Sequence, residues 1–282
     1  MSQVDLSFEL FPPKNPKQEA TFWRTVGQLE TFAPSYVSLT RGALGASTDH
    51  DQVLFDLHQA VSCKVAGHIT TRGANRHELS KLLGEWHQRG IRDLVALRGD
   101  GEAAADELPD ATALVELARE LGGFDIKVAG YPETHPKAQS RAADVAVAKA
   151  KVDAGASEIL TQFFFEANDF LRYRDDCAAA GIDVPVVPGI LPIADYQRVR
   201  QFAAQCGASV PDRFDEIFEG LEGNVAVQRE LGVDLASELC DKLNREGVER
   251  FHIYTLNIPN FATKLAENLV REFAPQPIRL VS

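Results

Sequence analysis

Polar side chains suited to catalysis follow several short apolar runs of this chain. The clearest run is residues 94–97, and Arg98, Gly99 and Asp100 come directly after it. A run of this length predicts one strand buried on both faces. Ligands of α/β sheets and barrels bind where such strands end, at their carboxyl ends. Gly99-Asp100-Gly101 is also typical of a turn, so this segment alone favours a turn over a ligand site. The residues at the ends of the other strands change this balance.

Glu9 is the sharpest catalytic candidate, because it lies inside an apolar strand between Phe8 and Leu10. A carboxylate in such a place is costly unless it is paired or protonated. Burial raises the pKa of a carboxyl group, and a raised pKa suits a general acid near neutral pH. The alternative is a salt-bridged glutamate with a structural role. Asp100 could be a turn residue, a metal ligand or a charge that modulates a neighbouring group.

The other predicted strands also end in polar or aromatic residues. His68 could be a core histidine with one hydrogen bond, and His135 lies in a predicted loop where it could contact an anion or face solvent. Gln162 precedes three phenylalanines, and a terminal amide there could address a planar heterocycle. Besides Glu9 and Asp100, the strand-end residues are Thr40, His68, Arg98, Tyr131, His135, Gln162 and Tyr254.

Predicted strands alternate with helical patterns along the whole chain. The strands are residues 4–11, 36–40, 64–69, 91–98, 126–130, 158–162, 184–190 and 250–256. This alternation predicts parallel βαβ units, and eight of them predict one closed (β/α)8 TIM barrel, a single α/β domain over residues 1–282. Pro185 and Pro188 are awkward for a central strand. The runner-up is an open doubly wound sheet, which usually has fewer strands and a phosphate loop after the first one.

Composition excludes several classes of function. The net charge of −12 makes nucleic acid and anionic membranes poor partners. The four cysteines are scattered, which fits a reducing cytoplasm and argues against iron–sulfur and structural zinc sites. Spacings typical of other metal sites are missing, so we expect no metal. Residues 2–5 do not resemble a signal peptide, and no apolar run reaches membrane-spanning length.

An anionic ligand would need local cations against this acidic background. Arg98, Lys137, Arg141 and Lys151 could supply them. The segment 99–104 matches the dinucleotide-binding pattern Gly-x-Gly-x-x-Gly/Ala, but its aspartate and glutamate would repel a pyrophosphate and no helix follows at once. We therefore reject a Rossmann-type site there.

Six segments together resemble methylenetetrahydrofolate reductases of the short bacterial type, and they span essentially the whole chain. They are residues 7–13, 97–100, 131–136, 161–165, 188–192 and 251–257. The resemblance implies a (β/α)8 barrel with non-covalent FAD. It also implies that NADH or NADPH, with NADH the expected donor, reduces the flavin. The flavin then reduces 5,10-methylenetetrahydrofolate to 5-methyltetrahydrofolate in a ping-pong scheme within one-carbon metabolism and methionine biosynthesis. We also expect a homo-oligomer, although the sequence gives no subunit number.

The resemblance implies a role for each matching residue. Glu9 corresponds to the general acid that helps to open the five-membered ring of the folate, and Asp100 to the aspartate near the flavin and the pterin. Gln162, Phe202 and Tyr254 correspond to substrate contacts. The positions that match flavin contacts are Thr40, His68, Leu97, Arg98, Gly99, Asp100, Ala129, Tyr131, His135, Asp144, Lys151 and Tyr254.

Three positions depart from the family pattern. Val147 and Ala150 stand where asparagine and arginine are frequent, which weakens the expected diphosphate and adenosine contacts. Ile258 stands where an arginine is thought to meet the folate tail.

Two other classes of function remain open from the sequence. One is a cofactor-free lyase or aldolase with Lys64 or Lys151 as a Schiff-base lysine. The other is a non-catalytic protein that binds folate or flavin.

Overall fold

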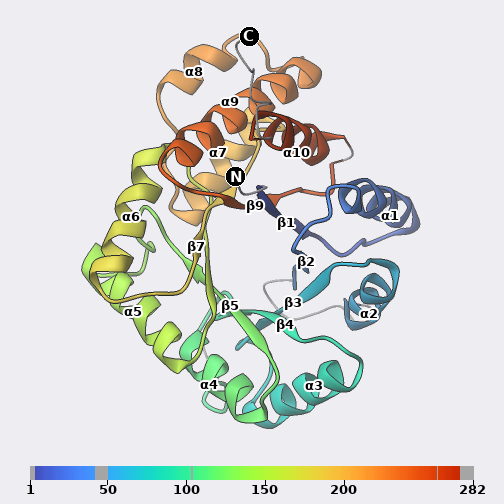
Figure 1. Ribbon diagram of the computed structural model, residues 1–282, viewed down its shortest axis with the longest axis vertical. Helices are drawn as coiled ribbons and strands as arrows, with labels where there is room; N and C mark the ends of the chain where they lie inside the picture. The colour runs from blue at the N-terminus through green and yellow to red at the C-terminus, as the bar shows by residue number, and fades with distance from the viewer. Residues whose placement is uncertain (1–3, 42–49, 103, 259, 274–282) are drawn as a thin grey trace, which may run out of the picture.

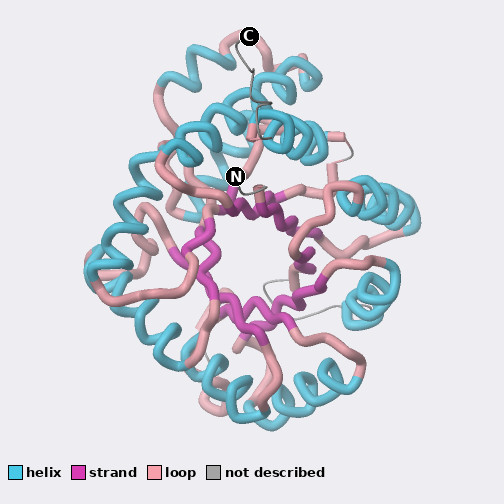
Figure 2. The backbone as a smooth tube through the Cα atoms, in the orientation of Figure 1, coloured by secondary structure: helices cyan, strands magenta, loops and turns pink. Residues whose placement is uncertain are grey.

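The structure is a computed structural model of the 282-residue chain, and it describes residues 4–41, 50–102, 104–258 and 260–273. Strands form a ring, and helices surround that ring on the outside (Figures 1 and 2). The strands are β1 (Asp5–Leu10), β2 (Tyr36–Leu39), β3 (Lys64–Thr70), β4 (Asp93–Leu97), β5 (Asp125–Gly130), β6 (Glu158–Thr161), β7 (Val186–Val187), β8 (Gly189–Ile190) and β9 (Arg250–Tyr254).

All neighbouring strands pair in parallel, in the order β7-β6-β5-β4-β3-β2-β1-β9-β8. Only Pro188 separates β7 from β8 along the chain, so the two ends of this order meet and close the barrel. The predicted TIM barrel is confirmed.

The predicted strand over residues 184–190 is wrong in one respect, because it is two short strands. Val186 pairs with Ile159 of β6, whereas Gly189 pairs with His252 of β9. Pro188 between them has no N–H to donate, but its carbonyl accepts a hydrogen bond from the His252 N–H at 3.0 Å. The chain therefore changes partner strands at the proline, which explains how a proline fits into a closed barrel.

The outer layer consists of helices that follow the strands. They are α1 (Pro16–Glu30), α2 (His50–Ala60), α3 (Arg76–Gln88), α4 (Ala111–Leu121), α5 (Arg141–Ala154), α6 (Ala167–Ala179), α7 (Tyr196–Cys206), α8 (Arg213–Phe218), α9 (Val225–Arg245) and α10 (Phe261–Glu272). Asn75 caps α3, and Glu78 completes a capping box.

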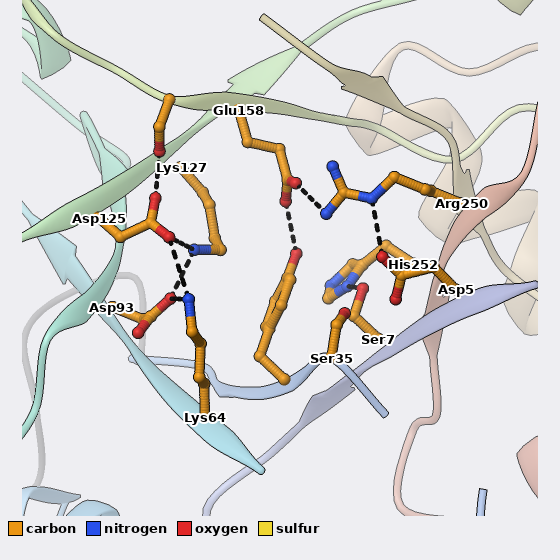
Figure 3. A network of polar contacts seen from close by, with 12 residues as sticks. Asp5, Ser7, Ser35, Lys64, Asp93, Asp125, Lys127, Glu158, Arg250 and His252 are labelled. Carbon is orange, nitrogen blue, oxygen red and sulfur yellow. Dashed lines mark hydrogen bonds and ion pairs between the residues drawn. The ribbon is translucent and has the colours of Figure 1, made fainter. Parts of the chain in front are cut away.

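A layer of charged side chains lies at the amino-terminal end of the barrel (Figure 3). The Lys127 ammonium lies 2.8 Å from Asp93, and the Arg250 guanidinium lies 2.6 Å from Glu158. The Tyr36 hydroxyl donates to Glu158 at 3.0 Å. We call Asp5, Lys64, Asp93, Asp125, Lys127, Glu158 and Arg250 the basal charge layer.

Most of the basal charge layer stands at the first residue of a strand, as Asp93 does in β4 and Glu158 in β6. Immediately inside it, Tyr36, Val95 and Leu160 are buried in an apolar cluster on the barrel axis. Because this end is filled, the opposite end, where the strands finish, is left to form a site.

Candidate active site

Two adjoining cavities lie at the carboxyl ends of the strands. The axial cavity has a volume of about 320 Å³, and Glu9 and His68 are among the residues that line it. The β4–β5 cavity has a volume of about 430 Å³ and lies beside the Arg98-Gly99-Asp100 turn. Both volumes are in the range of small-molecule sites. The residues common to both linings are Arg41, Leu97, Ala129 and Tyr131.

Every residue to which the family resemblance assigns a catalytic or binding role lines one of these cavities. Those on the axial cavity alone are Glu9, Thr40, His68, Gln162, Phe202 and Tyr254. Those on the β4–β5 cavity alone are Arg98, Gly99, Asp100, His135, Asp144 and Lys151. Because Leu97, Ala129 and Tyr131 line both, one elongated ligand could occupy the two cavities together.

Glu9 lies in β1 opposite Ser38 of β2 and Tyr254 of β9, and its side chain is 12% exposed. Burial raises the pKa of its carboxyl group to about 8. The nearest basic group is His68, whose Nε2 lies 3.6 Å from Glu9 Oε2. Burial, with the nearby His252 and His50 rings, lowers the His68 pKa to about 3. At neutral pH an uncharged carboxylic acid therefore faces an uncharged imidazole.

Aromatic side chains and one amide form another part of the axial cavity. Phe202 stacks on Phe163 with ring centroids 5.2 Å apart, and Phe163 meets Tyr254 edge to face. The Tyr254 hydroxyl donates to the Thr161 carbonyl at 2.8 Å. The Gln162 side-chain oxygen accepts from the Phe163 N–H at 3.0 Å, which fixes the amide at the end of β6. Phe202 is 42% exposed, so its ring is available to a planar ligand.

Cationic side chains gather on the β4–β5 cavity, as the sequence predicts for an anionic ligand. Of the predicted cations, Arg98, Lys137 and Lys151 line it, together with His135. Arg141 does not line it and lies instead 2.9 Å from Asp176. Lys151 Nζ also donates to the Ala129 carbonyl at 2.9 Å, and burial lowers the pKa of this lysine against the opposing effect of Asp144. Lys151 therefore lines the cavity and also holds the backbone of β5 through this hydrogen bond.

Asp144 and His135 are joined through the loop after β5. The Asp144 carboxylate accepts from the His135 backbone N–H at 3.0 Å. His135 Nδ1 accepts from the Lys137 N–H at 3.0 Å, so the neutral ring carries its proton on Nε2. His135 is thus prepared to donate a hydrogen bond while uncharged.

The turn after β4 needs its glycine. Gly99 has φ of 81°, and a Cβ atom there would lie 3.1 Å from side-chain atoms of Thr70 and Arg72. The Thr71 hydroxyl donates to the Arg98 carbonyl at 2.8 Å and holds the turn that presents Asp100. Ala103 of the rejected dinucleotide motif lies outside the described residues. Among the described residues after this turn, the next helix is α4, which begins at Ala111, so no helix follows the glycines at once.

Some lining residues were missed from the sequence. Arg41 lines both cavities and lies 3.4 Å from Asp51. Thr70 lines the β4–β5 cavity, and Phe11 and Leu256 line the axial cavity. Arg41 and Thr70 could have been predicted as polar residues near strand ends, since Thr70 ends β3 and Arg41 stands two residues after β2. Apolar residues such as Phe11 and Leu256 give no comparable signal.

The positions that depart from the family pattern differ in their consequences. Val147 lines the β4–β5 cavity and is 50% exposed, so an apolar side chain stands where a polar contact was expected. Ala150 is not among the lining residues of that cavity. Ile258 packs against the hydrophobic core. A Schiff base on Lys64 is also a poor fit, because Lys64 lies in the basal charge layer, 3.5 Å from Asp125.

The described residues contain no group of three or more His, Cys, Asp or Glu side chains placed to hold a metal ion. Their helices include none with the length and apolar character needed to cross a membrane.

Comparison with known proteins identifies the family. The family model described as methylenetetrahydrofolate reductase matches residues 1–270. The 5,10-methylenetetrahydrofolate reductase of Salmonella typhimurium is 40% identical over 258 residues, which cover 90% of this chain and 87% of that protein. The enzyme of the same name from Escherichia coli is 38% identical, with the same coverage of both chains.

A solved structure shares the fold at low sequence identity. It is an uncharacterized protein from Clostridium thermocellum that binds two copies of 5-methyl-5,6,7,8-tetrahydrofolic acid. Its TM-score is 0.69 at 12% identity, and the match covers 96% of this chain and 95% of that one. The family match, the identity to named reductases and the barrel lead to one conclusion: this chain belongs to the methylenetetrahydrofolate reductase family.

Proposed function

We propose that this chain reduces 5,10-methylenetetrahydrofolate to 5-methyltetrahydrofolate through non-covalent FAD, with NADH as the expected donor and NADPH as the alternative. The observation that carries the proposal is the buried Glu9 carboxyl group at the axial cavity, beside a second cavity lined by cations. The named reductases support folate as substrate, and the Clostridium thermocellum protein supports a folate site on this fold.

The β4–β5 cavity fits the charge of FAD. Arg98 and Lys151 would neutralise its diphosphate, and His135 would donate a hydrogen bond to it. Asp100, at the turn after β4, would lie toward the ring system, where a carboxylate opposes negative charge on the reduced flavin. Flavin supplies hydride transfer, for which no amino-acid side chain is suited. The exposed Val147 supplies no polar contact on this wall, so binding rests on the remaining groups.

In the axial cavity, Glu9 holds the proton that folate reduction needs. Opening the five-membered ring of the substrate requires protonation of a ring nitrogen, and a neutral carboxyl group can supply that proton. Gln162, Phe202 and Tyr254 would orient the planar pterin by hydrogen bonding and stacking. NADH and folate would use this cavity in turn, which gives a ping-pong scheme. We further propose a homo-oligomeric cytoplasmic enzyme of one-carbon metabolism and methionine biosynthesis, with one domain over residues 1–282.

The absorption spectrum of the purified protein tests this proposal. We expect a yellow protein with flavin absorbance that NADH bleaches under anaerobic conditions and that methylenetetrahydrofolate restores. Steady-state rates with NADH and with NADPH, each with menadione as acceptor, would establish the donor. A colourless protein that gains no flavin absorbance when mixed with FAD would contradict the proposal and favour the cofactor-free lyase.

A further inference from the structure

Two consecutive residues after β9 have an unusual backbone conformation. Leu256 has φ of 50° and Asn257 has φ of 51°. The left-handed region is uncommon for residues other than glycine, and asparagine tolerates it far better than leucine does. A bulky residue held there points to surrounding contacts that fix the loop.

The contacts that fix this loop come from the end of β1. The Phe11 N–H donates to Asn257 Oδ1 at 3.0 Å, and Asn257 Nδ2 donates to the Phe11 carbonyl at 2.6 Å. The Thr255 hydroxyl donates to the Glu9 carbonyl at 2.7 Å and accepts from the Asn257 N–H at 3.1 Å. We call Thr255 and Asn257 the mouth latch. It continues the pairing of β1 with β9 past Glu9 and Tyr254, where the regular ladder ends.

The mouth latch controls two side chains of the axial cavity. Phe11 and Leu256 both line this cavity, and neither lines the β4–β5 cavity. Phe11 is 36% exposed and is not a member of the hydrophobic clusters formed by the described residues, so packing holds it less firmly than a core side chain. Its position also depends on its backbone, to which Asn257 makes both hydrogen bonds.

We propose that Asn257 is a positioning residue for folate, because it holds Phe11 and Leu256 as an apolar wall against the pterin ring. The identity of the ligand, folate, rests on the proposed function. The mouth latch itself rests only on the hydrogen bonds described above. The side chain of Asn257 acts through Phe11 and Leu256 rather than on the reacting atoms. The wall belongs to the axial cavity, so its loss affects folate reduction and leaves the cations of the β4–β5 cavity in place.

The first test needs no substrate. Hydrogen exchange at the Phe11 amide is measured by NMR in the purified protein, in Asn257→Gly and in Asn257→Asp. Glycine keeps the left-handed backbone accessible and removes the latch, so the amide should exchange at least tenfold faster, given a typical hydrogen-bond contribution. Aspartate keeps an oxygen that can accept from the Phe11 N–H, so protection should largely remain. Unchanged exchange in Asn257→Gly would refute the latch.

Asn260 offers a matched control on the same loop. It also has a left-handed backbone, with φ of 61°, and its side chain accepts from Gln28 Nε2 at 2.8 Å, on the outer layer of helices. Asn260→Gly makes the same chemical change without touching the latch. We expect wild-type exchange at Phe11 and wild-type folate kinetics. Equal effects of both glycine variants would show a general loosening of the loop and overturn the positioning role.

The second test separates the folate KM from kcat. Asn257→Gly should raise the folate KM roughly tenfold, as expected for two lost hydrogen bonds felt indirectly, while kcat changes much less. NADH shares the axial cavity, but the wall faces the pterin ring, so the NADH–menadione rate at saturating NADH should change much less than the folate KM. Asn257→Asp should recover part of the loss. Equal slowing with both acceptors would overturn the positioning role. Absence of folate turnover in the unsubstituted protein would instead refute the proposed function, and the exchange result would still decide whether the latch exists.

Discussion

The Glu9 carboxyl group and the His68 imidazole lie 3.6 Å apart, and burial favours the uncharged form of each. If both were charged they would form an ion pair, and the carboxylate could not act as an acid. In the barrel neither is stabilised as an ion, because the surrounding residues exclude water. The proton of Glu9 is therefore retained near neutral pH and available to a basic atom that enters the axial cavity.

Glu9→Gln should separate the two halves of the proposed reaction. Glutamine keeps the size and hydrogen-bonding capacity of glutamate but has no acidic proton. Reduction of flavin by NADH should remain near normal, whereas folate reduction should slow by ~10²-fold or more, the low end for a general acid. Stopped-flow absorbance measures both steps. Equal slowing of both would indicate a structural role for the carboxyl group.

The raised pKa of Glu9 makes stability depend on pH. The pKa of Glu9 is about 8 in the folded protein, and its ordinary value is 4.5. The contribution of this group to the free energy of unfolding is therefore fully present below pH 4.5 and is lost as the pH rises through about 8. The loss develops between pH 4.5 and about 8 and totals roughly 5 kcal/mol, of which roughly 2 kcal/mol falls between pH 6.5 and 8. His68 and His252, with pKa values lowered to about 3, act in the opposite sense, but only below their ordinary value of 6.5. Thermal melting between pH 6.5 and 9 should therefore show a decline that Glu9→Gln removes.

Lys151→Met should weaken FAD binding by removing a cation from the β4–β5 cavity. The same change at Lys149 is a matched control, since Lys149 lies on the same helix but pairs with Asp153 on the outer face. Fluorescence titration of the apoprotein with FAD should show a dissociation constant roughly tenfold higher for Lys151→Met, typical of one charge-assisted hydrogen bond, and no change for Lys149→Met. Equal affinity of both variants would remove Lys151 from the flavin site.

Asp100→Asn should raise the midpoint potential of bound flavin. Removing a nearby negative charge stabilises the anionic reduced form. Potentiometric titration against a reference dye measures the shift. An unchanged or lower potential would place Asp100 away from the ring system.

The basal charge layer offers a prediction about stability alone. Lys127 is 4% exposed and 2.8 Å from Asp93, so Lys127→Met leaves a buried carboxylate without its closest cation and should destabilise the protein by about 3–5 kcal/mol. Lys64→Met removes a 62% exposed lysine from the same layer and should cost no more than about 1 kcal/mol. Urea unfolding measures both. Similar losses would show that burial does not set the strength of these pairs.

Much of the fold follows from local patterns. The alternation of apolar strands with amphipathic helices predicts the barrel, and residues typical of helix ends, Asn75 and Gly155, cap α3 and α5. The change of partner strands at Pro188 could not be predicted, because it depends on how β6 and β9 approach each other across the closure. The buried pair of Lys127 and Asp93 was also hidden, since charged residues beside a strand ordinarily face water.

The site was predictable where polar residues end strands and unpredictable where backbone contacts position apolar ones. Glu9 and Gln162 interrupt or follow apolar runs, so their chemistry is visible in the sequence. Asn257 appears in the sequence only as part of a motif, and its two hydrogen bonds to Phe11 join residues 246 positions apart. Such a contact exists only after the barrel closes and brings the first and last strands together.

The filled base of the barrel has a kinetic consequence. Tyr36, Val95 and Leu160 are buried in one cluster between the basal charge layer and the axial cavity, so described side chains fill this end of the barrel. Molecules that reach Glu9 therefore enter and leave at the carboxyl ends of the strands. Under the proposed function, the methylated folate has to leave before a nicotinamide can take its place. A slowly departing product would then inhibit nicotinamide oxidation. The enzyme would respond in this way to the cellular level of its own product without a separate regulatory site.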